Sequence, residues 1–301
     1  MTRTSYNKVI IPSESGRIDI RTLPDNTTEL LFDVGFNEEI GANILPDSLK
    51  KIYFCGDFNK EIIEDFIPPN TSHILFSGEY NSVIRKNALP ESLEILIFDG
   101  KYDQPIHEEV LPEKLTTLVL SGNYNQYLGE NVLPSNLKYL LFDGCYDKQI
   151  LRDVLPDSLE ILSIQGEFNQ IIEAHSLPDS LETLSLGCKY NKQILPKVLP
   201  ENLKHLEFHG CFNKRFKKSV INPNLETLTI SSSYTKPVEN IPLITKIIAM
   251  NIHLVGVDYY CHVPENDTNE MIRTKPPNTI VADIHSEGGF DIIKIERLLG
   301  R

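Results

Sequence analysis

Residues 155–172 read LPDSLEILSIQGEFNQII, and residues 89–106 read LPESLEILIFDGKYDQPI. Both stretches belong to a 22-residue pattern that recurs ten times, without insertion or deletion, between residues 23 and 242. Each unit begins with Leu-Pro or a near equivalent and carries an aromatic residue 13 positions later. A unit this short cannot bury a core of its own, so successive units must stack and share one interior. The sequence therefore predicts a repeat solenoid.

The internal spacing of the unit predicts its local structure. With the Leu of Leu-Pro as position 1, positions 8 and 10 are always apolar, as at Leu162 and Ile164. This spacing places both side chains on one face of a β-strand, so we expect one parallel strand per 22-residue coil. The Gly found at position 12 in seven units supplies the turn out of the strand. The eight residues after the aromatic position 14 leave room for irregular or short helical return segments.

A polar residue also recurs with the 22-residue period. Position 15 is Asn in seven units, Asp in two and Thr in one. These side chains could form a ladder of ligand-binding groups, or they could pair with backbone groups of their own or the adjacent coil. We favour the structural interpretation, because residues repeated in every unit of a solenoid usually serve the stack.

Composition narrows the class of protein. The net charge of −13 is the opposite of the basic footprint of nucleic-acid-binding proteins. No segment approaches the ~20 apolar residues that cross a bilayer, and the N-terminal stretch lacks the apolar core of a signal peptide. Five cysteines, none in a CxxC pair, indicate reduced, buried thiols. We expect an acidic, intracellular and cytoplasmic protein that binds neither nucleic acid nor membrane.

The two ends of the repeat array are predicted to be caps. Residues 1–22 form the N-terminal cap, with a partial unit starting at Ile18, one period before Ile40. Residues 243–301 form a degenerate eleventh repeat plus a C-terminal cap, because a solenoid must cover its open core edge. A small separate binding module is the alternative, and residues 280–284 read as a strand. The degenerate repeat places four residues at positions 1, 5, 8 and 10: Leu243, Ile247, Met250 and Ile252.

No catalytic motif is present. The chain contains no phosphate-binding loop, GxSxG, HExxH or paired CxxC. His205 and His209 share one face of a predicted strand but lie four residues apart, about 13 Å, which is too far for one metal ion. The basic run 214–218 falls in a return segment and reads as solvated surface. Neither spacing nor repetition supports a site built from Cys261, His262, Asp283 and His285. We expect no enzyme, no cofactor and no metal.

The two quoted stretches resemble the FNIP repeat, a short leucine-rich-repeat-like unit with the pattern LPxSLxxLxFxxxFNxPI. The resemblance covers residues 23 to about 242. It implies a right-handed, horseshoe-like solenoid that binds other proteins. In many family members an F-box precedes the repeats and links the bound target to a ubiquitin ligase. Only 22 residues precede the first unit here, so we expect no F-box of roughly 40 residues.

One surface feature points to a binding site. Position 9 faces away from the predicted core, yet it is apolar in the first six units and polar in the last four. Strands lie about 4.8 Å apart, so six such side chains form a stripe roughly 25 Å long. There are two alternative explanations for these apolar residues. They could reflect strand propensity alone, or a terminal segment could fold back over the stripe. The predicted partner-binding residues are Leu31, Tyr53, Leu75, Ile97, Val119 and Leu141, widened by Ile95 and Tyr139 and rimmed by Asp33, Asp99 and Asp143.

These observations favour a non-catalytic protein–protein interaction scaffold. It binds a partner protein on the exposed face of the solenoid sheet, because an apolar strip edged with charge is typical of a contact surface. Two alternatives remain. The chain could be a substrate adaptor that lacks its own F-box and engages ubiquitin-ligase components, or a structural rod in a larger assembly.

Overall fold

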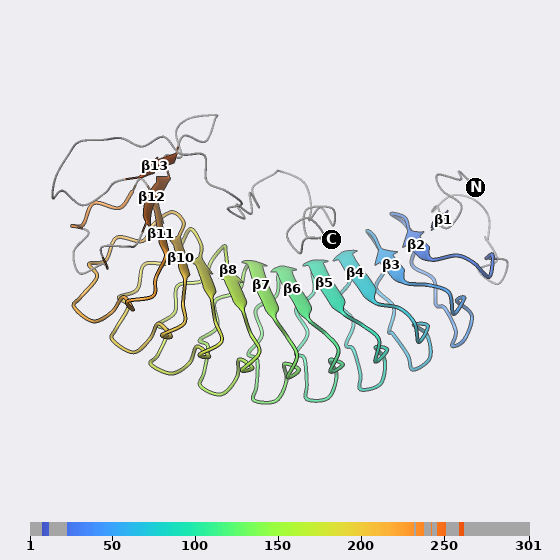
Figure 1. The fold of residues 1–301 in the computed structure, drawn as a ribbon. Coiled ribbons are helices and arrows are strands. Elements are labelled where there is room, and N and C mark those ends of the chain that lie inside the picture. The colour runs from blue at the N-terminus through green and yellow to red at the C-terminus, as the bar shows by residue number, and fades with distance from the viewer. Residues whose placement is uncertain are drawn as a thin grey trace.

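The computed structural model describes residues 8–11, 23–231, 233–237, 242, 246–250 and 259–261. These residues form a solenoid built around one 13-stranded sheet, in which the strands lie side by side in chain order (Figure 1). The strands are β1 Lys8–Ile11, β2 Glu29–Phe32, β3 Lys51–Phe54, β4 His73–Gly78, β5 Ile95–Gly100, β6 Thr117–Gly122, β7 Tyr139–Gly144, β8 Ile161–Ile164, β9 Thr183–Leu186, β10 His205–Phe208, β11 Thr227–Ser231, β12 Lys246–Met250 and β13 Tyr259–Cys261.

The predicted arrangement of one parallel strand per coil is confirmed. Each strand from β2 to β10 pairs with the next at a register of 22 residues, as in Leu118 beside Leu140. The return segments are irregular, and the described part of the chain contains no helix, so the short helical alternative is wrong. The Pro at position 2 begins a tight turn instead, because its carbonyl accepts the amide of position 5, as between Pro156 and Leu159 (3.1 Å).

The coils share one continuous core. Phe54, Phe98 and Phe142 at position 10 are at most 1% exposed and belong to a single hydrophobic cluster that runs the length of the array. The aromatic residues at position 14 stack along the body, for example Tyr80 on Tyr102 with ring centroids 6.0 Å apart. Because every coil covers the core of its neighbour, no single coil is an independent unit.

The solenoid is curved, with the strands lining its concave side and the return segments its convex side (Figure 1). The aromatic columns follow this arc. Rings at position 10, next to the strands, are 5.0 Å apart between Phe54 and Phe76, whereas rings at position 14 are 6.0 Å apart between Phe58 and Tyr80. The spacing widens from the strand side to the return side, so each coil is a wedge.

Glycine at position 12 allows the closest approach between coils. Gly78, Gly100 and Gly122 all have positive φ, between 63° and 138°. A Cβ added at Gly122 would lie 2.1 Å from the carbonyl oxygen of Gly100, directly below it in the stack. Both the dihedral angle and the contact therefore require glycine here.

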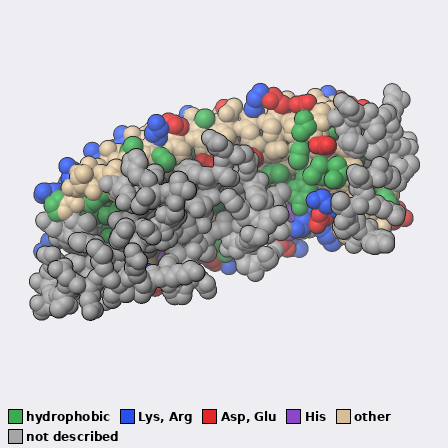
Figure 2. Space-filling view, turned by 90° about the horizontal axis from the view of Figure 1, so that it is seen from above, with side chains coloured by type: hydrophobic (Ala, Val, Ile, Leu, Met, Phe, Trp, Pro, Cys, Tyr) green, Lys and Arg blue, Asp and Glu red, His purple; other side chains and the backbone are tan. Residues whose placement is uncertain are grey.

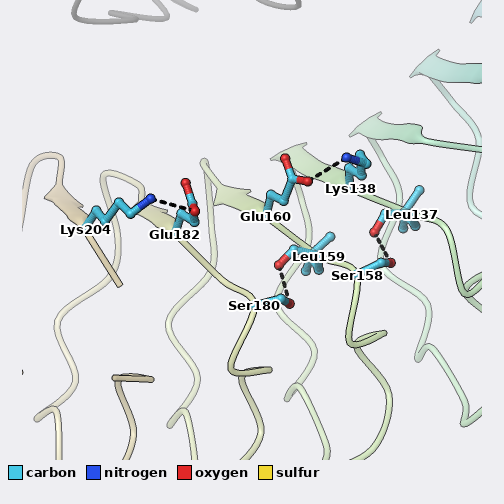
Figure 3. A network of polar contacts seen from close by, with 8 residues as sticks. All are labelled: Leu137, Lys138, Ser158, Leu159, Glu160, Ser180, Glu182 and Lys204. Carbon is cyan, nitrogen blue, oxygen red and sulfur yellow. Dashed lines mark hydrogen bonds and ion pairs between the residues drawn. The ribbon is translucent and has the colours of Figure 1, made fainter. Parts of the chain in front are cut away.

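Polar ladders satisfy the backbone between coils. The side-chain oxygen of each Asn or Asp at position 15 accepts the backbone amide of position 15 in the next coil, at 2.8–3.0 Å. The structural interpretation of this ladder is thus confirmed. Serine hydroxyls at position 4 add a second ladder, since Ser158 and Ser180 donate to the carbonyls of Leu137 and Leu159 (Figure 3).

The ends of the array depart from the strict repeat. In the N-terminal cap segment, β1 adds a parallel strand next to β2, and its Ile11 is 3% exposed in the common core. Ile18 lies outside the described residues. At the other end, Ile247 pairs with Leu228, which occupies position 8, so Ile247 also sits at position 8 and the predicted position 5 is wrong. The preceding return segment is shorter than a full period, which shifts the register.

Two further features of the C-terminal end differ from the repeat pattern. Strand β13 pairs antiparallel with β12, with Ala249 opposite Tyr260, whereas the repeat predicts only parallel strands. The predicted strand at residues 280–284, as well as Leu243 and Ile252, lies outside the described residues.

The four cysteines whose side chains the structure describes are free, but the prediction that they are buried fails for two of them. Cys145 and Cys211 are exposed, and Cys55 and Cys188 are half-buried. Cys145 and Cys211 both directly follow the turn at position 12, where the chain passes to the surface.

Candidate functional site: the concave face

Side chains at positions 7, 9 and 11 point away from the shared core and onto the concave face. There, β3 to β6 carry a second hydrophobic cluster, separate from the main core and formed by five buried residues. Figure 2 looks onto this side of the molecule and shows hydrophobic side chains gathered together, with acidic and basic side chains next to them. The five residues are Tyr53, Leu75, Ile95, Ile97 and Val119.

The structure brings the predicted position-9 residues together but does not leave them open. Tyr53 and Leu75 are 8% exposed, Ile97 is 3% exposed, and Val119 has no exposed surface. The prediction that this stripe is solvent-exposed is therefore wrong for these residues and for Ile95. Leu31 and Leu141, at the two ends of the stripe, are half-buried and pack against the cluster. The repeat pattern indicates which face of the sheet a side chain lies on, but it does not indicate how far that side chain is buried there.

The rim residues lie where the sequence places them. Asp33, Asp99 and Asp143 are half-buried at position 11, as is Tyr139 at position 7. Asp99 and Asp143 both have an interaction partner. Their role in partner binding stays a prediction.

The N-terminal end of the stripe has one cationic and one thiol group. Lys8 lies 3.9 Å from the carboxylate of Glu29, and its ammonium group is 5.9 Å from the ring centroid of Tyr53. Burial raises the pKa of the Cys55 thiol, an effect partly offset by a hydrogen bond with Ser77. A thiol with a raised pKa is a poor nucleophile, which does not favour chemistry at this position.

The C-terminal half of the concave face has a polar network instead. Gln165 is 7% exposed and donates from Nε2 to the hydroxyl oxygens of Ser163 (3.1 Å) and Ser185 (3.0 Å). The ring Nε2 of His209 lies 3.1 Å from the Ser185 hydroxyl and 3.4 Å from a carboxylate oxygen of Glu207. Sequence reasoning missed this network. The sequence feature that could have indicated this network is the change from apolar to polar residues at position 9 after the sixth unit.

The described residues hold no cluster of side chains suited to binding a metal ion. No three His, Cys, Asp or Glu side chains among them lie close enough together to bind a metal ion. An open groove of about 260 Å³ runs between two successive coils on the return side, and three of its lining residues, Asp153, Asp157 and His175, are exposed. His262, Asp283 and His285 lie outside the described residues, as does the side chain of Cys261.

The return segments carry the remaining surface features. The basic run 214–218 is in a return segment as predicted, with Phe216 in the core. Large exposed hydrophobic residues such as Leu151 and Leu195 occur singly on these segments, which is normal for a soluble surface. No helix long and apolar enough to cross a bilayer occurs among the residues that the structure describes.

The geometry defines the class of protein first: a parallel β-solenoid of about ten turns with a repeat of about 22 residues, like a leucine-rich-repeat solenoid. Such folds are usually non-catalytic and typically serve as binding scaffolds. The FNIP Repeat family matches this chain in seven overlapping or adjoining segments, and the chain therefore belongs to this family. The matched segments are residues 17–57, 58–101, 102–145, 124–167, 146–189, 168–211 and 190–233.

A solved structure supports the same assignment. CroV588, described as a novel circular LRR protein, is 34% identical in sequence with a TM-score of 0.69. The match covers 75% of this chain and 37% of CroV588, so this chain spans little more than a third of the length of that protein. A complex of TLR13 with ssRNA13 matches at 13% identity and a TM-score of 0.44, over 76% of this chain and 44% of that one, which is too distant for any argument. No sequence among curated proteins matches this chain.

Proposed function

We propose that this chain is a non-catalytic protein-interaction scaffold that binds a partner protein on its concave face. Its mechanism is surface complementarity along a rigid curved body. The fold class supports this proposal, because stacked coils present an extended concave surface suited to binding. We place the scaffold inside the cell, in the cytoplasm, from the composition of the chain.

The second hydrophobic cluster is the observation that carries the proposal. The main core already accounts for positions 8, 10, 14 and 18 in coils one to nine, so apolar residues at position 9 are not required to build the solenoid. They occur only in the first six units, whereas later units place Ser163, Ser185, Glu207 and Thr229 there. Strand propensity acts on all ten units alike, so it does not explain the change.

The test is capture of a partner from native cells by the full chain, followed by substitution on the two faces. Leu31→Asp with Leu141→Asp places charges at the two ends of the stripe, where the side chains are half-buried. Leu151→Asp with Leu195→Asp places the same charges on the convex side, where the side chains are 49% and 44% exposed. We expect the first pair to abolish capture and the second pair to leave it unchanged, with both variants folded by circular dichroism.

The identity of the captured protein separates the candidate functions. One unrelated protein, lost only with the concave-face pair, supports the scaffold. Recovery of cullin-type ligase subunits would favour a substrate adaptor, and abundant stoichiometric self-association would favour a structural rod. Equal loss of capture with both pairs of substitutions would contradict binding on the concave face.

A further inference from the structure

The return segments of coils eight, nine and ten carry a cluster of basic side chains. Lys192, Lys214 and Lys236 share position 16, directly after the Asn ladder that joins these three coils, so they lie next to one another along the stack. The aromatic rings at position 14 are 6.2 Å apart between coils eight and nine and 6.1 Å apart between coils nine and ten. We call the following six residues the basic patch: Lys192, Lys214, Arg215, Lys217, Lys218 and Lys236.

The patch is basic within a chain that is acidic elsewhere. Coils one to five, residues 23–132, contain 19 acidic and 7 basic residues, whereas coils eight and nine, residues 177–220, contain 4 acidic and 8 basic residues. The return segments 190–198 and 212–220 contain no Asp or Glu. At a spacing of about 6 Å per coil, coil five lies about 24 Å from coil nine, roughly three Debye lengths at physiological ionic strength. The acidic coils are therefore screened from the patch.

Other lysines of the solenoid pair with a glutamate of an adjacent coil. Lys138 lies 2.7 Å from a carboxylate oxygen of Glu160, and Lys204 lies 2.7 Å from one of Glu182 (Figure 3). No ion pair of this kind joins a patch residue to a carboxylate in the part of the chain that the structure describes. All six patch side chains are exposed or half-buried, so their charges can reach a ligand.

The backbone that carries the centre of the patch is held from both sides. Gln193 of coil eight donates from Nε2 to the carbonyl oxygen of Arg215 (2.8 Å), and Tyr234 of coil ten donates its hydroxyl to the carbonyl oxygen of Lys214 (3.3 Å). Phe216, the next residue in the chain, is 3% exposed and packs in the common core. A backbone that is already fixed reduces the ordering cost of binding a ligand.

We propose that the basic patch binds an acidic, extended peptide segment of a partner protein. The patch spans three coils, about 12 Å, and positions 16–20, at most about 14 Å, which matches four or five residues of an extended chain. Carboxylates of such a segment accept charge-assisted hydrogen bonds from lysine and arginine. The site lies on the convex side, away from the concave face, so the solenoid can bind ligands on both sides at once.

The size of the patch and the charge around it favour a short peptide over nucleic acid or a membrane surface. A duplex or a bilayer extends well beyond three coils, and its phosphates would then approach the acidic coils. A segment of four or five residues stays within the patch. The interpretation of the run 214–218 as solvated surface considered that run alone, whereas the structure adds Lys192 and Lys236 from the adjacent coils.

Fluorescence anisotropy of a labelled peptide of six glutamates, added to the full chain at 50 mM salt, tests this site. We expect saturable binding that weakens several-fold at 300 mM salt, because salt screens exposed charges. Lys214→Glu, Lys217→Glu and Lys218→Glu together should weaken binding by about tenfold or more, since three exposed ion pairs are replaced by repulsion. The corresponding glutamine variant should lose less, and circular dichroism checks that both variants fold.

A matched control places the same charge change outside the patch. Lys50→Glu, Lys60→Glu and Lys114→Glu alter coils two and five, and Lys60 occupies position 16, as Lys214 does. The net charge changes equally in both triple variants, so we expect the control to weaken binding by less than about twofold. Equal weakening by the two variants would assign binding to net charge and overturn the proposal, as would the absence of peptide binding at 50 mM salt.

Two further probes identify a different occupant. A 12-base-pair DNA duplex or vesicles containing phosphatidylserine, each at the same salt concentration, are compared with the peptide. Tighter binding of either probe, lost in the patch variant and kept in the control, would assign the patch to phosphate groups and overturn the peptide proposal. Weaker binding of both probes than of the peptide supports it. None of these measurements uses the concave face, so their outcome is independent of the proposed function.

Discussion

The phenol groups of Tyr80, Tyr124 and Tyr190 at position 14 lie inside the core. Their rings stack in the aromatic column, but their hydroxyl groups are buried without a hydrogen-bond partner. A buried unsatisfied polar group costs about 1–3 kcal/mol. Phe58 and Phe168 fill the same position in other coils without this cost.

We expect Tyr80→Phe, Tyr124→Phe and Tyr190→Phe each to leave the free energy of unfolding unchanged or to raise it by roughly 1 kcal/mol, since each removes an unsatisfied hydroxyl and keeps the ring. Urea denaturation at pH 7 measures the change. Destabilisation of all three variants would mean that the hydroxyls make hydrogen bonds in solution.

Glycine at position 12 gives a second prediction at the residue scale. Gly122→Ala places a methyl group 2.1 Å from the Gly100 carbonyl oxygen at a φ of 63°, so it should lower the free energy of unfolding by several kcal/mol, of the order seen for strained and overpacked sites. Gly129→Ala is the matched control. Its added Cβ would lie 3.5 Å from Val132, an ordinary contact, and we expect a change near zero in the same thermal or urea denaturation. Equal effects at the two glycines would contradict the close stacking of the coils.

Not every strained position could be found from the sequence. One residue in each of nine coils, at position 21, has a left-handed φ of 56–67°. These residues include Asn43, Glu109 and Lys197, so no single residue type marks the position. The Gly at position 12 was predictable because it recurs, whereas a conformation imposed by the stack on varied residues was not.

At the scale of the single coil, the Asn ladder is the element that joins each turn to the next. The Oδ1 atom of Asn191 accepts the amide of Asn213 at 3.0 Å. Asn191→Ala removes this acceptor and should lower the free energy of unfolding by about 1–3 kcal/mol, because the amide of Asn213 loses its partner. Asn191→Asp keeps the acceptor, as Asp103 and Asp147 already do at this position, and we expect less than half of that loss. Urea denaturation of the two variants at pH 7 measures the difference.

The repeat pattern predicts the contacts that recur in each coil, but little about features that occur only once. Strand positions, the faces of the side chains, the core residues and the backbone role of the Asn ladder all follow from spacing, because the same contacts recur in each coil. The register of β12 and the antiparallel β13 depend on a shortened return segment and on residues outside the repeat. The burial of Ile97 and Val119 was missed because periodicity assigns a side chain to a face of the sheet and contains no information about how far it is buried there.

At the scale of the whole molecule, a change within one coil affects the coils on either side, because the coils are stacked and share one core. Each coil covers its neighbour, so disruption of a few central coils exposes a core edge on both sides. Wedge-shaped coils also keep the concave face curved over its whole length (Figure 1), which fixes the spacing of any contacts that a partner makes along it.

Five buried tyrosines spread over coils three to eight make the whole solenoid sensitive to alkali. Burial raises the pKa of Tyr80, Tyr102, Tyr124, Tyr146 and Tyr190 well above the usual value of about 10. Below pH 10 both the folded and the unfolded chain keep these protons, so stability is unaffected. Above pH 10 the unfolded chain releases them while the folded chain holds them, and the free energy of unfolding therefore falls as pH rises.

We expect the urea midpoint of the full chain to be constant from pH 8 to about 9.5 and to fall steadily between about pH 10 and 11.5. The variant with Phe at residues 80, 124 and 190 lacks three of the five groups, so its midpoint should fall by less than half as much over the same interval. Phenolate absorbance followed in parallel should rise together with unfolding, because the buried rings ionise only when the solenoid opens. If the midpoint of this variant falls as steeply as that of the unaltered chain, the alkaline transition belongs to lysines instead. If phenolate absorbance rises before unfolding, the phenols reach water in the folded protein.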